Sequence, residues 1–315
     1  MTLKKLHHPI FKILFLPQQK LTSNMNKLKF LLLGSIAFLS SCSSDDSSPT
    51  SVTEEPNLII KLKFSDTQPR LNNFGQPSEI APGNAAQSPI VNGMSAHYIE
   101  LASSATTLLG EGEVIYKGDD TNAGGSQAID FSKAIIVANG EVFLKVPLKD
   151  IAAGSYDWIR VSVSYQNGTI KFLHNGNMYN GTLASFIGYN NYITSFNVNG
   201  QTVTVNDDKK QGYWAFETLG QIIQGQAPEG AVTVPNPLFN SSPIPQGSCV
   251  LTGQFNNGLN ITGNETKDIV VDLSFSINNS FEWTEINHDG KYEPTAGETL
   301  IDMGLRGLIP YVTYQ

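Results

Sequence analysis

Apolar and polar residues alternate along much of the chain after Pro56. The alternation is clearest at residues 58–64, 142–148, 158–165 and 269–277. Successive side chains of a strand point to opposite faces, so a period of two residues predicts strands that bury one face. Pro147 cannot donate a backbone hydrogen bond, which predicts that its strand lies at a sheet edge or ends there.

Shorter strands are predicted between these segments, near residues 97–102, 112–117, 169–174, 182–187, 192–198, 202–206, 213–217 and 249–254. The turn signals between them are Gly118-Asp119-Asp120, Asn139-Gly140, Asn167-Gly168, Asn199-Gly200 and Asn257-Gly258. An Asn-Gly pair favours a hairpin because both residues tolerate positive φ. No stretch of a dozen residues has helical periodicity. The pattern predicts an all-β fold, an antiparallel β-sandwich of the immunoglobulin or prealbumin kind.

The sandwich is predicted to span residues 57–315, and one segment inside it allows a subdivision. Residues 221–247 are rich in Gln, Gly and Pro. They could link a domain at 57–220 to a smaller C-terminal β subdomain at 248–315, or form one long loop of a single unit. The single unit is preferred because 248–315 offers about three strands, and a sheet of that size is marginal alone.

The first 41 residues have a different pattern. Residues 25–29 are short and basic, residues 30–39 are apolar, and Leu39-Ser40-Ser41-Cys42 follows. The apolar run has the length of a signal-peptide core and falls short of the roughly 20 residues that span a bilayer. This arrangement resembles the lipobox of bacterial lipoproteins, which implies a signal peptide at 25–41 and lipid on Cys42. The alternative is an ordinary cleaved signal with an incidental cysteine. Residues 1–24 are then expected to be an upstream gene-model extension, with Met25 as the true start.

Residues 42–56 are predicted to be a flexible acidic tether, because they are small, polar and poor in core-forming side chains. Ser43-Ser44-Asp45-Asp46 resembles the surface-export signal of Bacteroidota lipoproteins. That resemblance implies an outer-membrane protein that faces the cell exterior; a generic linker is the alternative. Residues 75–89 and 281–307 also resemble uncharacterised lipoproteins of flavobacterial type, which brings no known activity.

Charge and cysteine content limit the kinds of partner that the chain is expected to bind. Removing residues 1–41 takes away six lysines and no acid, which changes the formal net charge from −8 to −14. Nucleic acid is a poor partner for such a chain, since its backbone needs Lys and Arg. Anionic headgroups would also repel it, so the lipid must act as the membrane anchor. Cys249 is left without a partner for an intrachain disulfide, and we expect a buried structural thiol.

The best local motif is the acidic segment 285–298. Glu285, Asn287 and Asp289 alternate before a glycine, Lys291 would offer its carbonyl, and Glu298 could close the ring. The spacing resembles the calcium loop of EF-hands, in which alternate oxygens surround one ion. The first ligand is Glu rather than Asp, and Glu298 comes two residues late. We expect structural calcium here; a polar hairpin loop without metal is the alternative.

A second candidate site lies on one predicted strand. Tyr156, Trp158 and Arg160 share a semi-polar face that could stack a sugar ring, although a loop could equally cover it. Trp214 and Trp283 are interpreted as core or rim residues. The histidines after residue 42 are far apart, which gives no support to a zinc site.

No sequence motif of a hydrolase, metalloprotease or nucleotide-binding enzyme occurs in the chain. The leading hypothesis is therefore a non-catalytic surface module that binds a glycan or a partner protein. One alternative is a surface polysaccharide hydrolase, which requires two carboxylates about 5–10 Å apart in a cleft. The other is a structural envelope lipoprotein.

Overall fold

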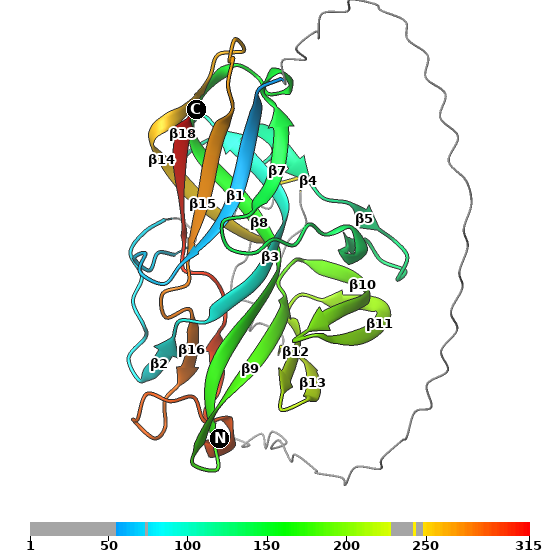
Figure 1. Cartoon of the computed structure of the whole chain (residues 1–315), viewed down its shortest axis with the longest axis vertical. Coiled ribbons are helices and arrows are strands. Elements are labelled where there is room, and N and C mark those ends of the chain that lie inside the picture. Colours follow the sequence, from blue (N-terminus) through cyan, green and yellow to red (C-terminus); the bar gives the residue numbers. More distant parts are fainter. Residues whose placement is uncertain (1–54, 73–74, 228–241, 244–247) are drawn as a thin grey trace, which may run out of the picture. The chain divides into compact units, whose positions relative to one another are not determined.

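Strands build almost all of the described chain (Figure 1). A computed structural model describes residues 55–72, 75–227, 242–243 and 248–315. The predicted extension, signal peptide, Cys42 and most of the tether lie outside the described residues. So does most of the Pro-rich segment that was considered as a domain boundary. Residues Glu55–Gln315 group into one compact unit.

The strands in the first half are β1 (Asn57–Ser65), β2 (Asn84–Gln87), β3 (Ile90–Ala102), β4 (Glu113–Lys117), β5 (Asp120–Thr121), β6 (Ala128–Asp130) and β7 (Val142–Pro147). They are followed by β8 (Gly154–His174), β9 (Asn177–Phe186), β10 (Asn190–Val198), β11 (Gln201–Lys210), β12 (Tyr213–Thr218) and β13 (Gln221–Gln226). The last strands are β14 (Cys249–Ile261), β15 (Ile269–Ser276), β16 (Phe281–Thr284), β17 (Leu300–Asp302) and β18 (Leu308–Tyr314). The described residues contain no α-helix, and their short 3₁₀ turns are η1 (Phe131–Lys133), η2 (Leu148–Asp150) and η4 (Pro294–Ala296).

Two sheets form the sandwich. One has the strand order β18-β15-β1-β7, and the other has the order β13-β12-β9-β8-β3-β4 with β14 also paired to β8. Strand β8 is 21 residues long. Its first half pairs with β14 and its second half with β9, so the larger sheet continues beyond the sandwich (Figure 1).

The main core lies between the four-stranded sheet and the β3–β8–β14 part of the larger one. Leu58, Ile60 and Leu62 point inward from β1, and Val161 and Val163 point inward from β8. All five are fully buried. Burying such an aliphatic side chain contributes about 1.5–3 kcal/mol relative to leaving it exposed. The predicted all-β sandwich is confirmed.

Two features of the pairing differ from the prediction. Strands β1 and β15 pair in parallel, as do β6 and β10, so the sandwich is not wholly antiparallel. The chain between β1 and β15 is long enough to return in the same direction, which a parallel pair requires. The segment 248–315 supplies β14 to one main sheet and β15 and β18 to the other, so its strands are interleaved with those of the first half.

Some of the turns predicted from Asn-Gly pairs are confirmed and others are wrong. Asn199 and Gly200 close the β10–β11 hairpin with φ of 46° and 76°, as predicted. The hairpin predicted at residues 167–168 is wrong, because β8 runs straight through them. The pair Asn175-Gly176, with φ of 50° and 76°, closes that hairpin instead. Residues 257–258 lie inside β14, where the register shifts against β8.

The extended half of the larger sheet is covered on both faces. On one face lies the sheet β11-β10-β6-β5, with Phe186, Phe196 and Tyr213 in the shared core. On the other face lies the small sheet β17-β16-β2, whose Phe281 and Trp283 pack against Ile170.

Candidate functional site

The predicted calcium loop lies between β16 and β17, and its two glutamates hold the backbone. Glu285 accepts hydrogen bonds from the Asp289 backbone N–H at 3.2 Å and from the Trp283 indole N–H at 3.2 Å. Glu298 is buried and accepts from the backbone N–H groups of Ile286 at 3.2 Å and Glu293 at 2.6 Å. Both carboxylates therefore stabilise the loop by themselves.

The remaining predicted ligands are also engaged within the loop. Asn287 donates to the Glu293 carboxylate at 2.9 Å. Asp289 accepts from the backbone and the ammonium group of Lys291 at 3.0 and 3.1 Å. Within the part of the chain that the structure describes, no group of three or more His, Cys, Asp or Glu side chains is placed to hold a metal ion. The side chains of Glu285, Asn287, Asp289 and Glu298 are thus paired within the loop, and calcium binding stays a prediction.

The predicted sugar platform on β8 does not form one accessible face. Tyr156 is buried in the main core and donates to the Ala152 carbonyl at 2.7 Å. Arg160 is 2% exposed, donates to the Thr107 carbonyl, and lies 3.9 Å from the Glu100 carboxylate. Trp158 between them is half-buried. The structure thus favours the alternative, in which a loop covers this face.

The covering loop, residues 103–112, is held by a carboxylate that the sequence did not single out. Glu100 is fully buried and accepts from the backbone N–H groups of Gly110 at 3.1 Å and Gly112 at 2.6 Å. The Tyr98 hydroxyl donates to it at 3.1 Å. A buried carboxylate needs such donors, because without them its desolvation would go uncompensated. Glu100 and Arg160 are therefore structural groups.

His97 is the one histidine with a charged neighbour in the described residues. It is 3% exposed, and its Nε2 lies 3.1 Å from Oδ1 of Asp120. The Tyr189 hydroxyl donates to the same oxygen at 2.7 Å. Burial lowers the pKa of His97 and outweighs the opposing effect of the carboxylate, so the imidazole is neutral. This group ties β5 and the Tyr189 turn to β3, and it has no nucleophile beside it.

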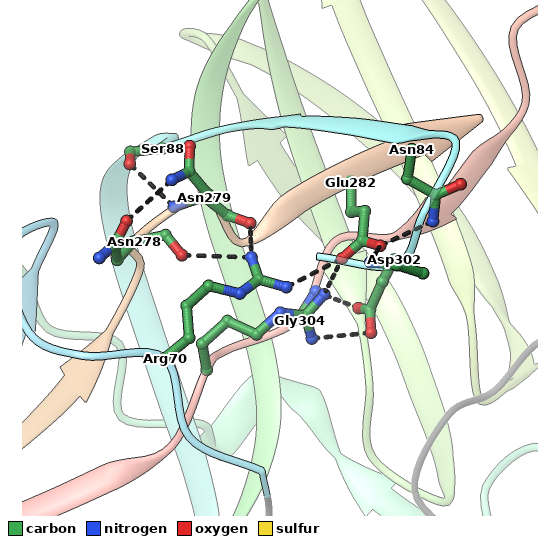
Figure 2. Close-up of polar contacts among 10 residues, drawn as sticks. Arg70, Asn84, Ser88, Asn278, Asn279, Glu282, Asp302 and Gly304 are labelled. Atoms are coloured by element: carbon green, nitrogen blue, oxygen red, sulfur yellow. Dashed lines mark hydrogen bonds and ion pairs between the residues drawn. The ribbon is translucent and has the colours of Figure 1, made fainter. Parts of the chain in front are cut away.

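A larger charged network lies on the outer side of the small sheet (Figure 2). Glu282 of β16 lies 2.9 Å from Arg70 and 3.4 Å from Arg306, which in turn lies 2.8 Å from Asp302. The side chains of Glu282, Arg70 and Arg306 are 7%, 9% and 12% exposed. We call these four residues the Glu282 cluster. Ion pairs this deeply buried depend on every member being present.

Further hydrogen bonds complete the Glu282 cluster. The Asn84 side chain donates to Glu282 at 2.7 Å, and the Ala81 backbone N–H donates to it at 3.3 Å. Arg70 also donates to the Asn279 carbonyl (Figure 2). Burial acts to raise the pKa of Glu282, but the hydrogen bonds from Asn84, Ala81 and Arg70 outweigh it and lower the pKa. The cluster fastens β2, β16 and β17 to the loop after β1.

Next to the small sheet, the larger sheet carries half-buried aromatic side chains, one of which, Phe216, packs against the cluster that contains Phe281 and Trp283. Trp214 and Phe216 are two residues apart on β12 and face the same way. Tyr179 pairs with Phe172 across β9 and β8, with ring centroids 5.9 Å apart, and Phe172 lies 5.6 Å from Phe216. We call Trp214, Phe216, Tyr179 and Phe172 the aromatic face. Of these, Phe172 is buried and the other three are half-buried.

Two glycines let these rings lie flat on the sheet. A β-carbon on Gly225 would lie 2.4 Å from the Trp214 indole, and one on Gly181 would lie 2.0 Å from the Phe216 ring. Both rings therefore cover glycine backbone on a neighbouring strand. Trp214 is a rim residue, as predicted, while Trp283 is fully buried in the core.

A pocket lies next to the aromatic face, where the small sheet meets β8 and β9. Its free volume is about 20 Å³. The walls are largely apolar and include Ile170, Leu183, Phe281 and Leu305. Ser185 lines it and is the direct cross-strand neighbour of Trp214.

The pocket has a polar side that lacks partners. The hydroxyls of Ser185 and Ser280 are buried, and neither has a hydrogen-bond partner among the described residues. Gln166 also lines the pocket, but its amide donates to the Met303 carbonyl. Other buried side-chain atoms of the described residues, among them Arg160 Nε and Asn191 Oδ1, have no partner either.

Comparison with protein-family models, with curated proteins and with solved structures gave no match to this chain. Among the described residues, no helix is long and apolar enough to cross a membrane. The function must therefore be argued from the residues alone.

Proposed function

We propose that the chain is an outer-membrane lipoprotein, anchored by lipid on Cys42 and facing the cell exterior, whose sandwich binds a glycan without catalysis. The N-terminal pattern supports the proposed location, since a basic start, a short apolar run and Leu39-Ser40-Ser41-Cys42 occur together. The acidic tether after Cys42 supports surface display. A sandwich anchored by lipid is well suited to holding a ligand outside the cell.

The aromatic face is the observation that carries the binding proposal. Trp214, Phe216 and Tyr179 present half-buried rings on one side of two neighbouring strands, β9 and β12. Sugar rings have apolar C–H faces, and flat aromatic side chains cover such surfaces while leaving the hydroxyls free. The sequence predicted Trp158 for this role, but Trp214 has other half-buried aromatic side chains beside it and suits the role better.

A glycan array tests the binding function. The chain from residue 43 to 315 keeps the whole unit Glu55–Gln315 and lacks the lipid. We expect it to retain a subset of glycans without releasing products. Release of new reducing ends would favour a hydrolase instead, and no binding to any glycan would favour a structural envelope protein.

Labelling with palmitate and protease treatment of whole cells test the proposed lipid anchor and surface location. We expect labelled palmitate to be incorporated into the wild-type chain and to be absent from Cys42→Ala. We also expect protease added to whole cells to digest the chain. A chain that resists protease on intact cells but is cut after lysis would contradict surface display.

A further inference from the structure

The last strand of the larger sheet, β13, has an open edge. It pairs with β12 on one side, and no described residue pairs with its other side. The backbone groups of an antiparallel strand face the two sides alternately. The Ala227 backbone N–H, just after β13, donates to the Gly212 carbonyl at 2.9 Å, so the odd-numbered residues of β13 face β12. The backbone groups of the even-numbered residues, Ile222, Gln224 and Gln226, therefore point away from the sheet.

This edge lacks the features that usually prevent sheet edges from pairing. Exposed edge strands commonly carry proline or charged side chains, because these oppose the addition of another strand. The other ends of the two main sheets carry them: β7 contains Pro147, β18 contains Pro310, and β4 contains Glu113 and Lys117. Residues 221–226 read QIIQGQ, with no charge and no proline. Of the main-sheet ends that the structure describes, β13 is thus the best suited to accept another strand.

We propose that β13 pairs with β13 of a second copy of the chain, in antiparallel orientation, about a two-fold axis at Gln224. This dimer does not depend on the proposed glycan-binding function. An axis at Gln224 pairs that residue with its own counterpart and pairs Ile222 with Gln226 of the second copy. All the outward-facing backbone groups of β13 are then used, and about six hydrogen bonds form, because each such residue pair exchanges two.

Charge and symmetry favour a second copy at this edge. The formal net charge of −14 after residue 41 opposes contact between two copies of the chain. Along β13 no charged side chain would meet its like, since the strand is neutral throughout. The two-fold pairing also uses up the open edge of each copy, so the assembly closes as a dimer and does not continue as a fibre.

The side chains of β13 fit the same register. Ile223 and Gly225 pair with Phe216 and Trp214 of β12, so they lie on the side of the sheet that carries the aromatic face. An axis at Gln224 places Ile223 of one copy opposite Gly225 of the other. The Trp214 indole already covers Gly225, so the half-buried Ile223 of the second copy would pack beside that indole. The two aromatic faces would then form one continuous row across the dimer.

Sedimentation equilibrium of the chain from residue 43 to 315 tests the dimer. A contact of about five residue pairs a side is small, so we expect a dissociation constant of about 10 μM. Gln224→Lys puts two ammonium groups opposite each other at the axis and should weaken the dimer at least 10-fold. Gln221→Lys is the matched control, because it makes the same change at another exposed glutamine of β13 that does not face its counterpart. It should dimerise like the wild type.

A charge exchange separates loss of the contact from loss of the fold. Gln224→Lys also removes a hydrogen bond that the Tyr213 hydroxyl donates to the Gln224 side chain. Gln224→Glu should be as poor a dimer as Gln224→Lys, because it also places like charges together. An equal mixture of the two variants should dimerise again, because opposite charges then meet at the axis.

Disulfide formation tests the register. The Cα atoms of a hydrogen-bonded antiparallel pair are about 5.5 Å apart, a distance that a disulfide can bridge. Gln224→Cys should therefore give a covalent dimer when oxidised with copper phenanthroline. Gln221→Cys should not, because the two copies of residue 221 would lie six residues apart along the strands, about 20 Å.

Three results would overturn the dimer. One is a wild-type chain that stays monomeric at about 100 μM, ten times the expected dissociation constant. Another is Gln224→Lys dimerising as tightly as the wild type, which would place the contact elsewhere. The third is equal cross-linking of the two cysteine variants, which would contradict the register. A monomeric chain that still binds glycans would overturn the dimer and leave the proposed function standing.

Discussion

Replacing Glu282 by Gln should cost much of the stability of the fold. The change keeps the shape of the side chain but removes a carboxylate that contacts both Arg70 and Arg306. The new amide would point a donor at one of two guanidinium groups that are about nine-tenths buried. Removing one partner of a buried ion pair typically costs about 3–5 kcal/mol, and we expect the free energy of unfolding to fall by that amount.

Urea denaturation followed by tryptophan fluorescence measures the effect, since Trp283 is fully buried on the next position of β16. The control is Glu55→Gln, the same change in a pair with Lys149 in which both side chains are 60% exposed. Solvent screens such a pair, so the control should match the wild type. If Glu282→Gln is no more destabilising than Glu55→Gln, the cluster does not stabilise the small sheet and the reasoning fails.

Three more predictions follow from the same contacts. The pKa of Glu282 is lowered in the folded state, so its ionised carboxylate stabilises the fold above the unfolded pKa of about 4.3, and this stabilisation is lost as the pH falls below that value. The free energy of unfolding should therefore decrease less steeply with acid in Glu282→Gln than in the wild type. Glu298→Gln should lower the free energy of unfolding by about 1.5–3 kcal/mol, equally with and without EDTA, because its carboxylate bonds two backbone N–H groups. A wild-type melting temperature that drops in EDTA would instead support calcium. Cys249 is half-buried rather than buried as expected, and burial raises the pKa of its thiol to about 12, so the native chain should react with thiol reagents more slowly than the unfolded chain.

The positions of the strands were the most predictable part of the fold, and the pairing of one strand with another was the least predictable. Alternation at residues 58–64 and 269–277 matches β1 and β15 closely, because burial of one face acts on each strand separately. Nothing local shows that these two strands pair in parallel, since that depends on a contact between distant segments. The strands of the small sheet have three or four residues each, too few for a period to be recognised.

The candidate site was missed for a similar reason. Residues 213–216 are apolar or aromatic at every position, which is typical of a strand covered on both faces. The structure buries Tyr213 and Ala215 under the β10–β11 side and leaves Trp214 and Phe216 only half-buried on the other. The sequence pattern favoured Trp158 as a sugar-stacking residue because its neighbours include serines and an arginine. The structure places Glu100 and the Thr107 carbonyl of the loop after β3 against Arg160, and no sequence signal indicated either contact.

The Glu282 cluster and the aromatic face are connected through strand β16. Glu282 faces outward to the arginines, while its neighbour Phe281 faces inward, in the apolar cluster against which Phe216 of the aromatic face packs. Fixing one side of a short strand fixes the other, since successive side chains are held by the same backbone. Glu282→Gln should therefore weaken glycan binding under conditions where it is still folded, with the loss appearing as a faster release of the ligand. Glu55→Gln, which removes a pair whose side chains are both 60% exposed, should leave that release rate unchanged. Equal release rates for both variants and the wild type would mean that Phe281 is held by the apolar packing of the small sheet alone.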